Sequence, residues 1–152
     1  MFDRLKSVEY AKEWALKFNP KYYDFSLLGG DCTNFVSQCL HAGGVPMRYY
    51  KYGWYYSSLS NRAPAWTGVN EFWDFAVNNR GIGVKIQETT LNDLELADVI
   101  QFYNGERFYH AVIVTDLSNG IKVCSHDSPA LDRPLTSYNF KDLRCGKILN
   151  SP

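Results

Sequence analysis

The sequence has no block of charge of one sign and no long hydrophobic run. Its 152 residues include 16 basic and 16 acidic side chains, mixed along the chain, so the formal net charge is zero. Binding to nucleic acid or to an anionic membrane surface through charge needs an excess of Lys and Arg. A membrane-spanning helix needs about 18 or more apolar residues in a row. We therefore expect neither a nucleic-acid nor a membrane partner.

Cysteine is scarce, and its spacing is irregular. The four cysteines stand at positions 32, 39, 124 and 145, without the C-x-x-C pairs of a zinc site or the regular framework of a disulfide-rich domain. A chain of this length buries roughly 70% of its unfolded surface and needs no such crosslink. We expect free thiols, no cofactor, and one monomeric domain over residues 1–152.

Signal-peptide and common hydrolase motifs are also missing. The first 14 residues carry charges throughout, so the sequence as written predicts a cytoplasmic protein or export by another route. No G-x-S-x-G, H-E-x-x-H or P-loop is found, which gives no indication of a serine hydrolase, a zinc protease or a nucleotide site.

Aromatic residues are abundant, with 11 tyrosines, nine phenylalanines and four tryptophans. They gather in YYKYGWYY (49–56) and EFWDF (71–75). Aromatic side chains bury large apolar areas, so such clusters form core or the walls of a groove. We expect Trp54 and Tyr55 to line a substrate groove.

The hydrophobic pattern changes along the chain from a helical period to a strand period. Helices are expected over 7–18, from Asp31 as N-cap to the glycines at 43 and 44, and from Val69 to near Gly81. Alternating strands are expected over 98–103, 109–116, 121–126 and 147–149. Helices followed by an antiparallel sheet predict an α+β fold.

Cys32 stands at the start of the second predicted helix, within GGDCTNFVSQ (29–38). It shares a helical stripe with Phe35 and Cys39, so packing alone explains a small apolar side chain there. The helix N-terminus also offers unpaired N–H groups and a positive dipole end, which would lower the pKa of a thiol. The glycines before it, including Gly30, would admit a substrate backbone, and Asp31 would border the same site.

A cysteine nucleophile needs a base, and the chain has three histidines. His41 lies at the far end of the same predicted helix, out of reach. His110 opens a predicted strand and His126 ends the next one. A three-residue loop at 118–120 would place both on one face, with His126 orienting His110; a two-residue loop or a bulge would favour Asp127 instead.

Several segments together carry a resemblance to a known family. They are YAKEWALKFNPKYYDF (10–25), GGDCTNFVSQCLHAGG (29–44), WTGVNEFWDF (66–75) and YHAVIVTD (109–116). The chain resembles the putative amidase domain family of bacteria, a papain-like group related to NlpC-type and CHAP cell-wall peptidases. Relatives tend to have Gly-Asp where this chain has Ala97-Asp98.

The resemblance implies a single papain-like amidase domain with N-terminal helices packed on a C-terminal antiparallel sheet. It implies a cysteine amidohydrolase or peptidase that works through a thioester acyl-enzyme. The family pattern places the nucleophile on Cys32, the base on His110 and the third polar residue on His126. The substrate it implies is a peptide or a peptidoglycan fragment.

Two other classes of function fit some of the same residues. A catalytically inactive module could grip a peptide or glycan with the aromatic loop, and Cys32 would then be an inert packing residue. A metal site could use Cys32, His110 and His126, although no short-range ligand motif joins them.

Overall fold

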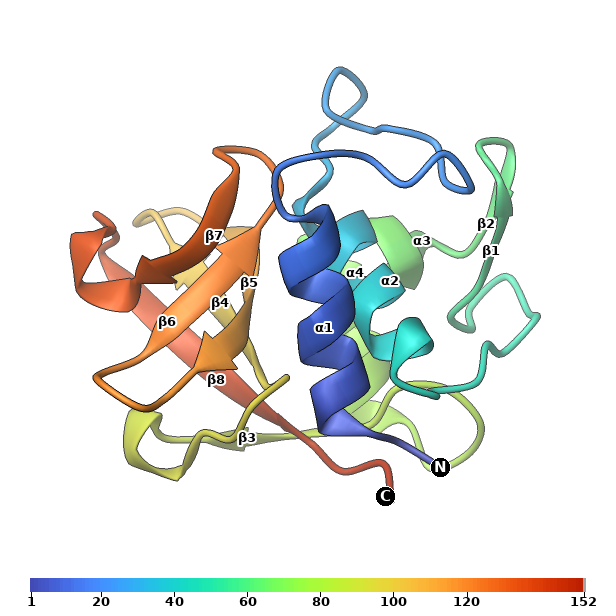
Figure 1. Ribbon diagram of the computed structural model, residues 1–152. Coiled ribbons are helices and arrows are strands. Elements are labelled where there is room, and N and C mark those ends of the chain that lie inside the picture. Colours follow the sequence, from blue (N-terminus) through green and yellow to red (C-terminus); the bar gives the residue numbers. More distant parts are fainter. Residues whose placement is uncertain (152) are drawn as a thin grey trace.

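The computed structural model describes residues 1–151 and has an α+β fold in which helices cover one face of an antiparallel sheet (Figure 1). The helices are α1 (Arg4–Trp14), α2 (Cys32–Ala42), α3 (Pro64–Thr67) and α4 (Val69–Asn78). The predicted fold class is thus confirmed. None of the helices in residues 1–151 has the length and apolar character needed to span a bilayer.

The main sheet has six strands in the order β3-β8-β4-β5-β6-β7, and every neighbouring pair is antiparallel. Its strands are β3 (Ile86–Thr89), β4 (Val99–Tyr103), β5 (Phe108–Asp116), β6 (Lys122–Ser125), β7 (Ala130–Pro134) and β8 (Asp142–Ile148). A separate small hairpin joins β1 (Tyr56–Ser58) to β2 (Asn61–Arg62). Short 3₁₀ turns, η1 (Leu91–Asp93) and η2 (Leu135–Ser137), precede β4 and β8.

The predicted elements agree with the structure best where the hydrophobic period is strong. Helix α2 begins at Cys32 as predicted, but α1 runs over Arg4–Trp14 instead of 7–18. Asp3 starts α1 early, because its carboxylate accepts hydrogen bonds from the N–H groups of Leu5 and Lys6. Strands β3 and β7 were not predicted.

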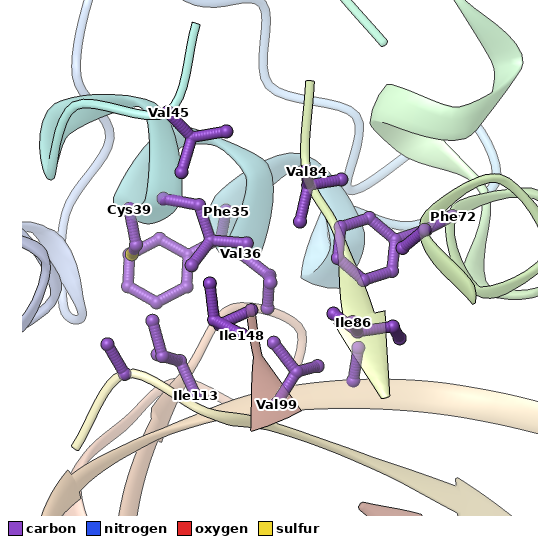
Figure 2. Close-up of a cluster of buried hydrophobic side chains, with 14 of the residues drawn as sticks. Phe35, Val36, Cys39, Val45, Phe72, Val84, Ile86, Val99, Ile113 and Ile148 are labelled. Carbon is purple, nitrogen blue, oxygen red and sulfur yellow. The ribbon is translucent and has the colours of Figure 1, made fainter. Parts of the chain in front are cut away.

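The larger hydrophobic core lies between the helices and the sheet. In Figure 2, Phe35 and Val36 of α2 face Ile113 of β5 and Val99 of β4 across this layer. The opposite face of the sheet carries a smaller cluster that includes Phe102. Because side chains alternate along a strand, odd-numbered β5 residues such as Ile113 face the helices and even-numbered ones face the smaller cluster.

The β5–β6 hairpin changes register within its length. Asp116 pairs with Lys122 near the turn, which is the register predicted for a three-residue loop. A bulge lies between Asp116 and Val114. On the side of the bulge away from the turn, the pairing is shifted by one residue, with Ile113 opposite Cys124. This shift reverses the faces on which the residues after β6 emerge.

The residue before Asp98 has an unusual backbone conformation. Ala97 has φ of 72°, a backbone conformation that glycine adopts most easily. The fully buried Asp98 carboxylate accepts a hydrogen bond of 2.7 Å from Arg4 and one of 3.0 Å from the N–H of Ile148. Asp98 therefore ties α1 to the centre of the sheet.

Candidate active site

Cys32 is the first residue of α2 and borders an open cleft of about 290 Å³. The cleft is also lined by Gly30, Glu71, Arg107 and Asp127. The Cys32 side chain is largely buried, with 5% of its surface exposed. A larger hollow of about 870 Å³ lies elsewhere, around the N-terminal residues, and contains neither a cysteine nor a histidine.

The N-terminus of α2 is capped by a residue from a distant turn. Oδ2 of Asp127 accepts hydrogen bonds from the N–H of Asp31 at 2.7 Å and from the N–H of Cys32 at 3.2 Å. Asp127 and Ser128 both have positive φ, 55° and 64°, so a strained turn holds this carboxylate in place. The carboxylate occupies N–H groups that could otherwise bind an oxyanion.

This arrangement reverses the pKa shift that the helix dipole predicted. Burial raises the pKa of the Cys32 thiol to about 11, and the nearby charge of Asp127 adds to the rise. Hydrogen bonds from the backbone N–H of Ala111 and from Thr33 lower the pKa of Cys32 by less. Cys32 is therefore a neutral thiol in the resting structure, mainly because it is buried, and the carboxylate at the positive end of the helix adds to this effect.

Asp31 does not border the cleft at Cys32, contrary to the expectation, and its side chain does not cap α2. The carboxylate is fully buried and accepts hydrogen bonds from the N–H of Phe25 at 2.8 Å and from Nδ2 of Asn34 at 2.9 Å. Its other oxygen lies 2.5 Å from Nδ1 of His126. Asp31 thus holds together the approach loop, the first turn of α2 and the end of β6.

His126 does not orient His110, because it emerges on the helix side of the sheet. Its Nε2 lies 2.7 Å from the carbonyl oxygen of Trp14, and its ring stacks on Phe35 at 4.1 Å. Both ring nitrogens face oxygen acceptors, so both must carry protons. Burial lowers the pKa of His126, but the hydrogen bonds to Asp31 and Trp14 raise it more, and the net pKa is raised.

The bulge in the β5–β6 hairpin explains why the predicted pairing of His126 with His110 was wrong. The turn itself has the expected register, with Gly120 at φ of 76°. The shift beyond Asp116 moves His126 to the face opposite the one that the turn alone predicts. The alternative partner, Asp127, lies at the N-terminus of α2 and not on the His110 ring.

His110 lies on β5 next to Ala111, whose backbone lowers the pKa of the Cys32 thiol. His110 pairs with Phe102 of β4, so its side chain starts on the sheet face of the smaller cluster, whereas Cys32 belongs to the core on the helix side. The His110 side chain is 8% exposed and packs beside Phe102 and Tyr138, with ring centroids 5.8 Å and 6.5 Å away. Burial and, to a smaller extent, the charge of Arg133 lower the pKa of His110 to about 4. The imidazole is therefore neutral at neutral pH.

The aromatic residues expected in the groove lie elsewhere. Trp54 is fully buried, donates a hydrogen bond of 3.0 Å to Ser37 and packs on Trp66 at 4.6 Å. Tyr55 is only partly buried and bonds Asn61 at 2.7 Å, away from the Cys32 cleft. Neither side chain lines the cleft at Cys32, and Trp54 instead belongs to the larger core.

Gly30 does line the cleft, as expected, but its close neighbour belongs to the protein itself. Gly30 has φ of 104°, and a Cβ added there would lie 2.6 Å from Oδ2 of Asp127. Glycine at this position therefore makes room for the carboxylate that caps α2.

The structure gives no support to a metal site. Both nitrogens of His126 are engaged away from Cys32, so the three expected ligands do not converge. Within residues 1–151, no group of three or more His, Cys, Asp or Glu side chains is arranged to hold an ion. All four cysteines are free and buried.

Comparison with known proteins identifies the family. The sequence model of the putative amidase domain family matches residues 1–146, so the chain belongs to this family. Two proteins of Bacillus subtilis (strain 168) are similar: the uncharacterized protein YhbB, 36% identical over 78% of this chain, and the uncharacterized protein YjcM, 29% identical over 90%. The chain spans 39% and 33% of their respective lengths. No solved structure matches it.

Proposed function

We propose that the protein is a papain-like cysteine amidohydrolase with Cys32 as nucleophile and His110 as general base. The observation that carries the proposal is the position of Cys32: it begins α2, borders an open cleft and has its pKa lowered by the backbone of Ala111, the β5 residue next to His110. Membership of an amidase family supports amide hydrolysis as the reaction.

The chemistry that we propose starts from a neutral pair. The pKa of Cys32 is about 11 and that of His110 about 4, so a resting thiolate–imidazolium pair is disfavoured. His110 takes the thiol proton as sulfur attacks the amide carbon. The C–N bond then breaks, the imidazolium protonates the leaving amine, and water hydrolyses the thioester, which regenerates the thiol.

Asp127 must leave the N-terminus of α2 before the backbone N–H of Cys32 can bind the oxyanion. Its carboxylate and a developing oxyanion would compete for the same donor, which lies 3.2 Å from Oδ2. Displacement of Asp127 would also remove a charge that raises the pKa of Cys32. Substrate binding and activation of the thiol would then be coupled.

The substrate that we propose is a peptide, with peptidoglycan stem peptides as one class. The cleft at Cys32 is polar, with Glu71 and Arg107 on its wall, which suits the charged and amide groups of a peptide. Glycine at 29 presents no side chain there, and a Cβ at that position would meet open space.

One observation favours a second function, a catalytically inactive peptide-binding module. The raised pKa of Cys32 and the carboxylate on its helix are what an inert thiol would show. In that case the cleft would bind a peptide without cutting it.

The two functions are separated by product analysis. Purified peptidoglycan and short acyl peptides are incubated with the protein and analysed by mass spectrometry. We expect new products with the wild type and with Cys39→Ala, a buried cysteine of the same helix, but none with Cys32→Ala. Intact substrates that nevertheless bind the wild type would overturn the amidohydrolase and favour the binding module.

A further inference from the structure

Two buried polar side-chain atoms in residues 1–151 have no hydrogen-bond partner, and they belong to neighbouring rings. They are Nε2 of His110 and the hydroxyl oxygen of Tyr138. The centroids of the two rings are 6.5 Å apart, with 40° between their planes. Both rings pack around Phe102, at 5.8 Å and 5.0 Å, on the sheet face turned away from the helices.

A buried imidazole nitrogen and a buried hydroxyl without hydrogen-bond partners lower the stability of the fold. Other buried polar side chains of the protein have partners, including Asp31, Asn34 and His126. An imidazole nitrogen and a phenol oxygen can hydrogen-bond at about 2.8 Å, a length that their ring separation accommodates after small side-chain rotations. One such bond would satisfy both atoms together.

The Tyr138 ring is held in place by its own neighbours. The guanidinium of Arg133 lies 3.7 Å from the ring centroid, and its Nε donates a hydrogen bond of 2.8 Å to Ser137. The N–H of Tyr138 donates to the carbonyl of Leu135 at 3.2 Å. The hydroxyl is therefore presented to the small cluster by a ring that its neighbours hold, so the rotation that closes the hydrogen bond falls mainly to the His110 side chain.

We propose that Tyr138 is the positioning residue of His110: its hydroxyl oxygen accepts a hydrogen bond from the Nε2–H of His110 and fixes the imidazole tautomer. Nδ1 then carries the lone pair that accepts the Cys32 proton, which requires this nitrogen to reach Cys32 past the β5 backbone, because the His110 side chain starts on the opposite face of the sheet. This inference rests on the proposed function and supplies the third member of the site that His126 was expected to be. A hydroxyl suits this place better than a carboxylate, because it leaves the buried ring neutral.

The test compares Tyr138→Phe with Tyr103→Phe. Tyr103 is a half-buried tyrosine at the end of β4 whose ring lies 5.0 Å from that of Phe108, and it does not line the cleft at Cys32. Two measurements are made on each variant: amide hydrolysis over a range of pH, and ¹⁵N NMR of the His110 ring. The ¹⁵N shifts report the tautomer without any need for activity.

We expect Tyr138→Phe to lower kcat about tenfold with KM unchanged, the scale of one lost hydrogen bond. Its ¹⁵N spectrum should change from a single Nε2–H tautomer to a mixture, and the control should match the wild type in both measurements. An unchanged spectrum, or a changed spectrum with unchanged kcat, would overturn the role of Tyr138. If the wild type shows no Cys32-dependent hydrolysis, the proposed function fails separately, and the spectrum still decides whether Tyr138 holds His110.

Discussion

The pKa of the Cys32 thiol is raised mainly by burial and further by a carboxylate that lies 95 residues further along the chain. The sequence predicts a helix start at Cys32, and the structure has one there. It cannot predict that Asp127 occupies the N-terminus of that helix, because this contact depends on a tertiary turn with two positive φ angles. The direction of the pKa shift therefore had to come from the structure.

Asp127→Asn should make Cys32 more reactive. The amide oxygen can still accept from the N–H groups of Asp31 and Cys32, but the negative charge that raises the pKa of Cys32 is gone. We expect the pKa of Cys32 to fall and its alkylation by iodoacetamide near neutral pH to become several times faster. Peptide mapping after limited labelling measures this rate.

The matched control for this variant is Asp116→Asn, which removes an equal charge from the exposed end of β5. Alkylation of Cys32 should be unchanged there. Equal rates in wild type and Asp127→Asn would show that burial alone sets the pKa of the thiol.

Trp54 should contribute to stability and not to substrate binding. It is fully buried against Trp66, so Trp54→Ala should lower the free energy of unfolding by about 3–5 kcal/mol. Tyr55→Phe removes only a hydroxyl that bonds Asn61 near the surface and should cost less than about 1 kcal/mol. Urea unfolding of both variants tests this, and equal stability losses would contradict the assignment of Trp54 to the core.

At the scale of secondary structure, the sequence predicts those elements whose hydrophobic period is regular. Helix α2 and strand β5 are of this kind, with apolar stripes that match their buried faces. Strand β7 was missed because its sequence, ALDRP, has a proline and two charges, and its burial is uneven. Its place at the sheet edge, next to β6, explains why such a sequence is tolerated there.

The bulge in β5 shows why strand register could not be read from the sequence. Thr115, between the two registers, donates a hydrogen bond of 2.6 Å to Asp132 of β7, which itself has φ of 51°. The sulfur of Cys124 donates to the same threonine oxygen at 3.5 Å. These contacts join three strands, so no local pattern in the hairpin could indicate them.

The pair of Asp31 and His126 should stabilise the packing of α2 on the end of α1. His126 links the α2 N-terminus to the carbonyl of Trp14, the last residue of α1. His126→Ala leaves the Asp31 carboxylate buried without this partner and should cost about 3–5 kcal/mol. His41→Ala, at the other end of α2, serves as a control and should cost less, because His41 is half-buried and bonds only the Val45 carbonyl.

A double-mutant cycle isolates the pair. Asp31→Asn with His126→Ala removes both charges, so the double variant should lose less stability than the sum of the single losses. Additive losses in denaturant unfolding would show that the two side chains act independently.

For the whole molecule, the composition and the order of elements were sufficient to predict an α+β fold, and the motif around Cys32 was sufficient to indicate the family. The arrangement around the thiol was not predictable to the same degree. Cys32 and His110 lie on elements with clear patterns, whereas Asp127 and Tyr138 lie in irregular segments. Their places depend on how the turns after β6 and β7 fold back on the sheet.

The two buried histidines should give the stability of the protein opposite dependences on pH. The pKa of His110 falls from its ordinary value of 6.5 to about 4 on folding, so the unfolded state binds more protons between these values. Its contribution is complete above the unfolded pKa and is lost as pH falls through the folded one. The pKa of His126 is raised on folding, so its contribution is complete below 6.5 and is lost as pH rises through the folded pKa.

His110→Phe separates these effects. Phenylalanine suits the site beside Phe102 and Tyr138 and has no proton to bind. When the pH falls from about 7.5 to about 5, protonation of His110 in the unfolded state should lower the free energy of unfolding of the wild type by about 2 kcal/mol. The variant has no such group and should not show this loss. The measurement is urea unfolding at both pH values, with His126→Gln as the opposite case: its deficit relative to wild type should be larger at pH 5. If the free energy of unfolding changes equally with pH in the wild type and in His110→Phe, His110 has a similar pKa in the folded and unfolded chains. Its ring would then not be buried as neutral imidazole.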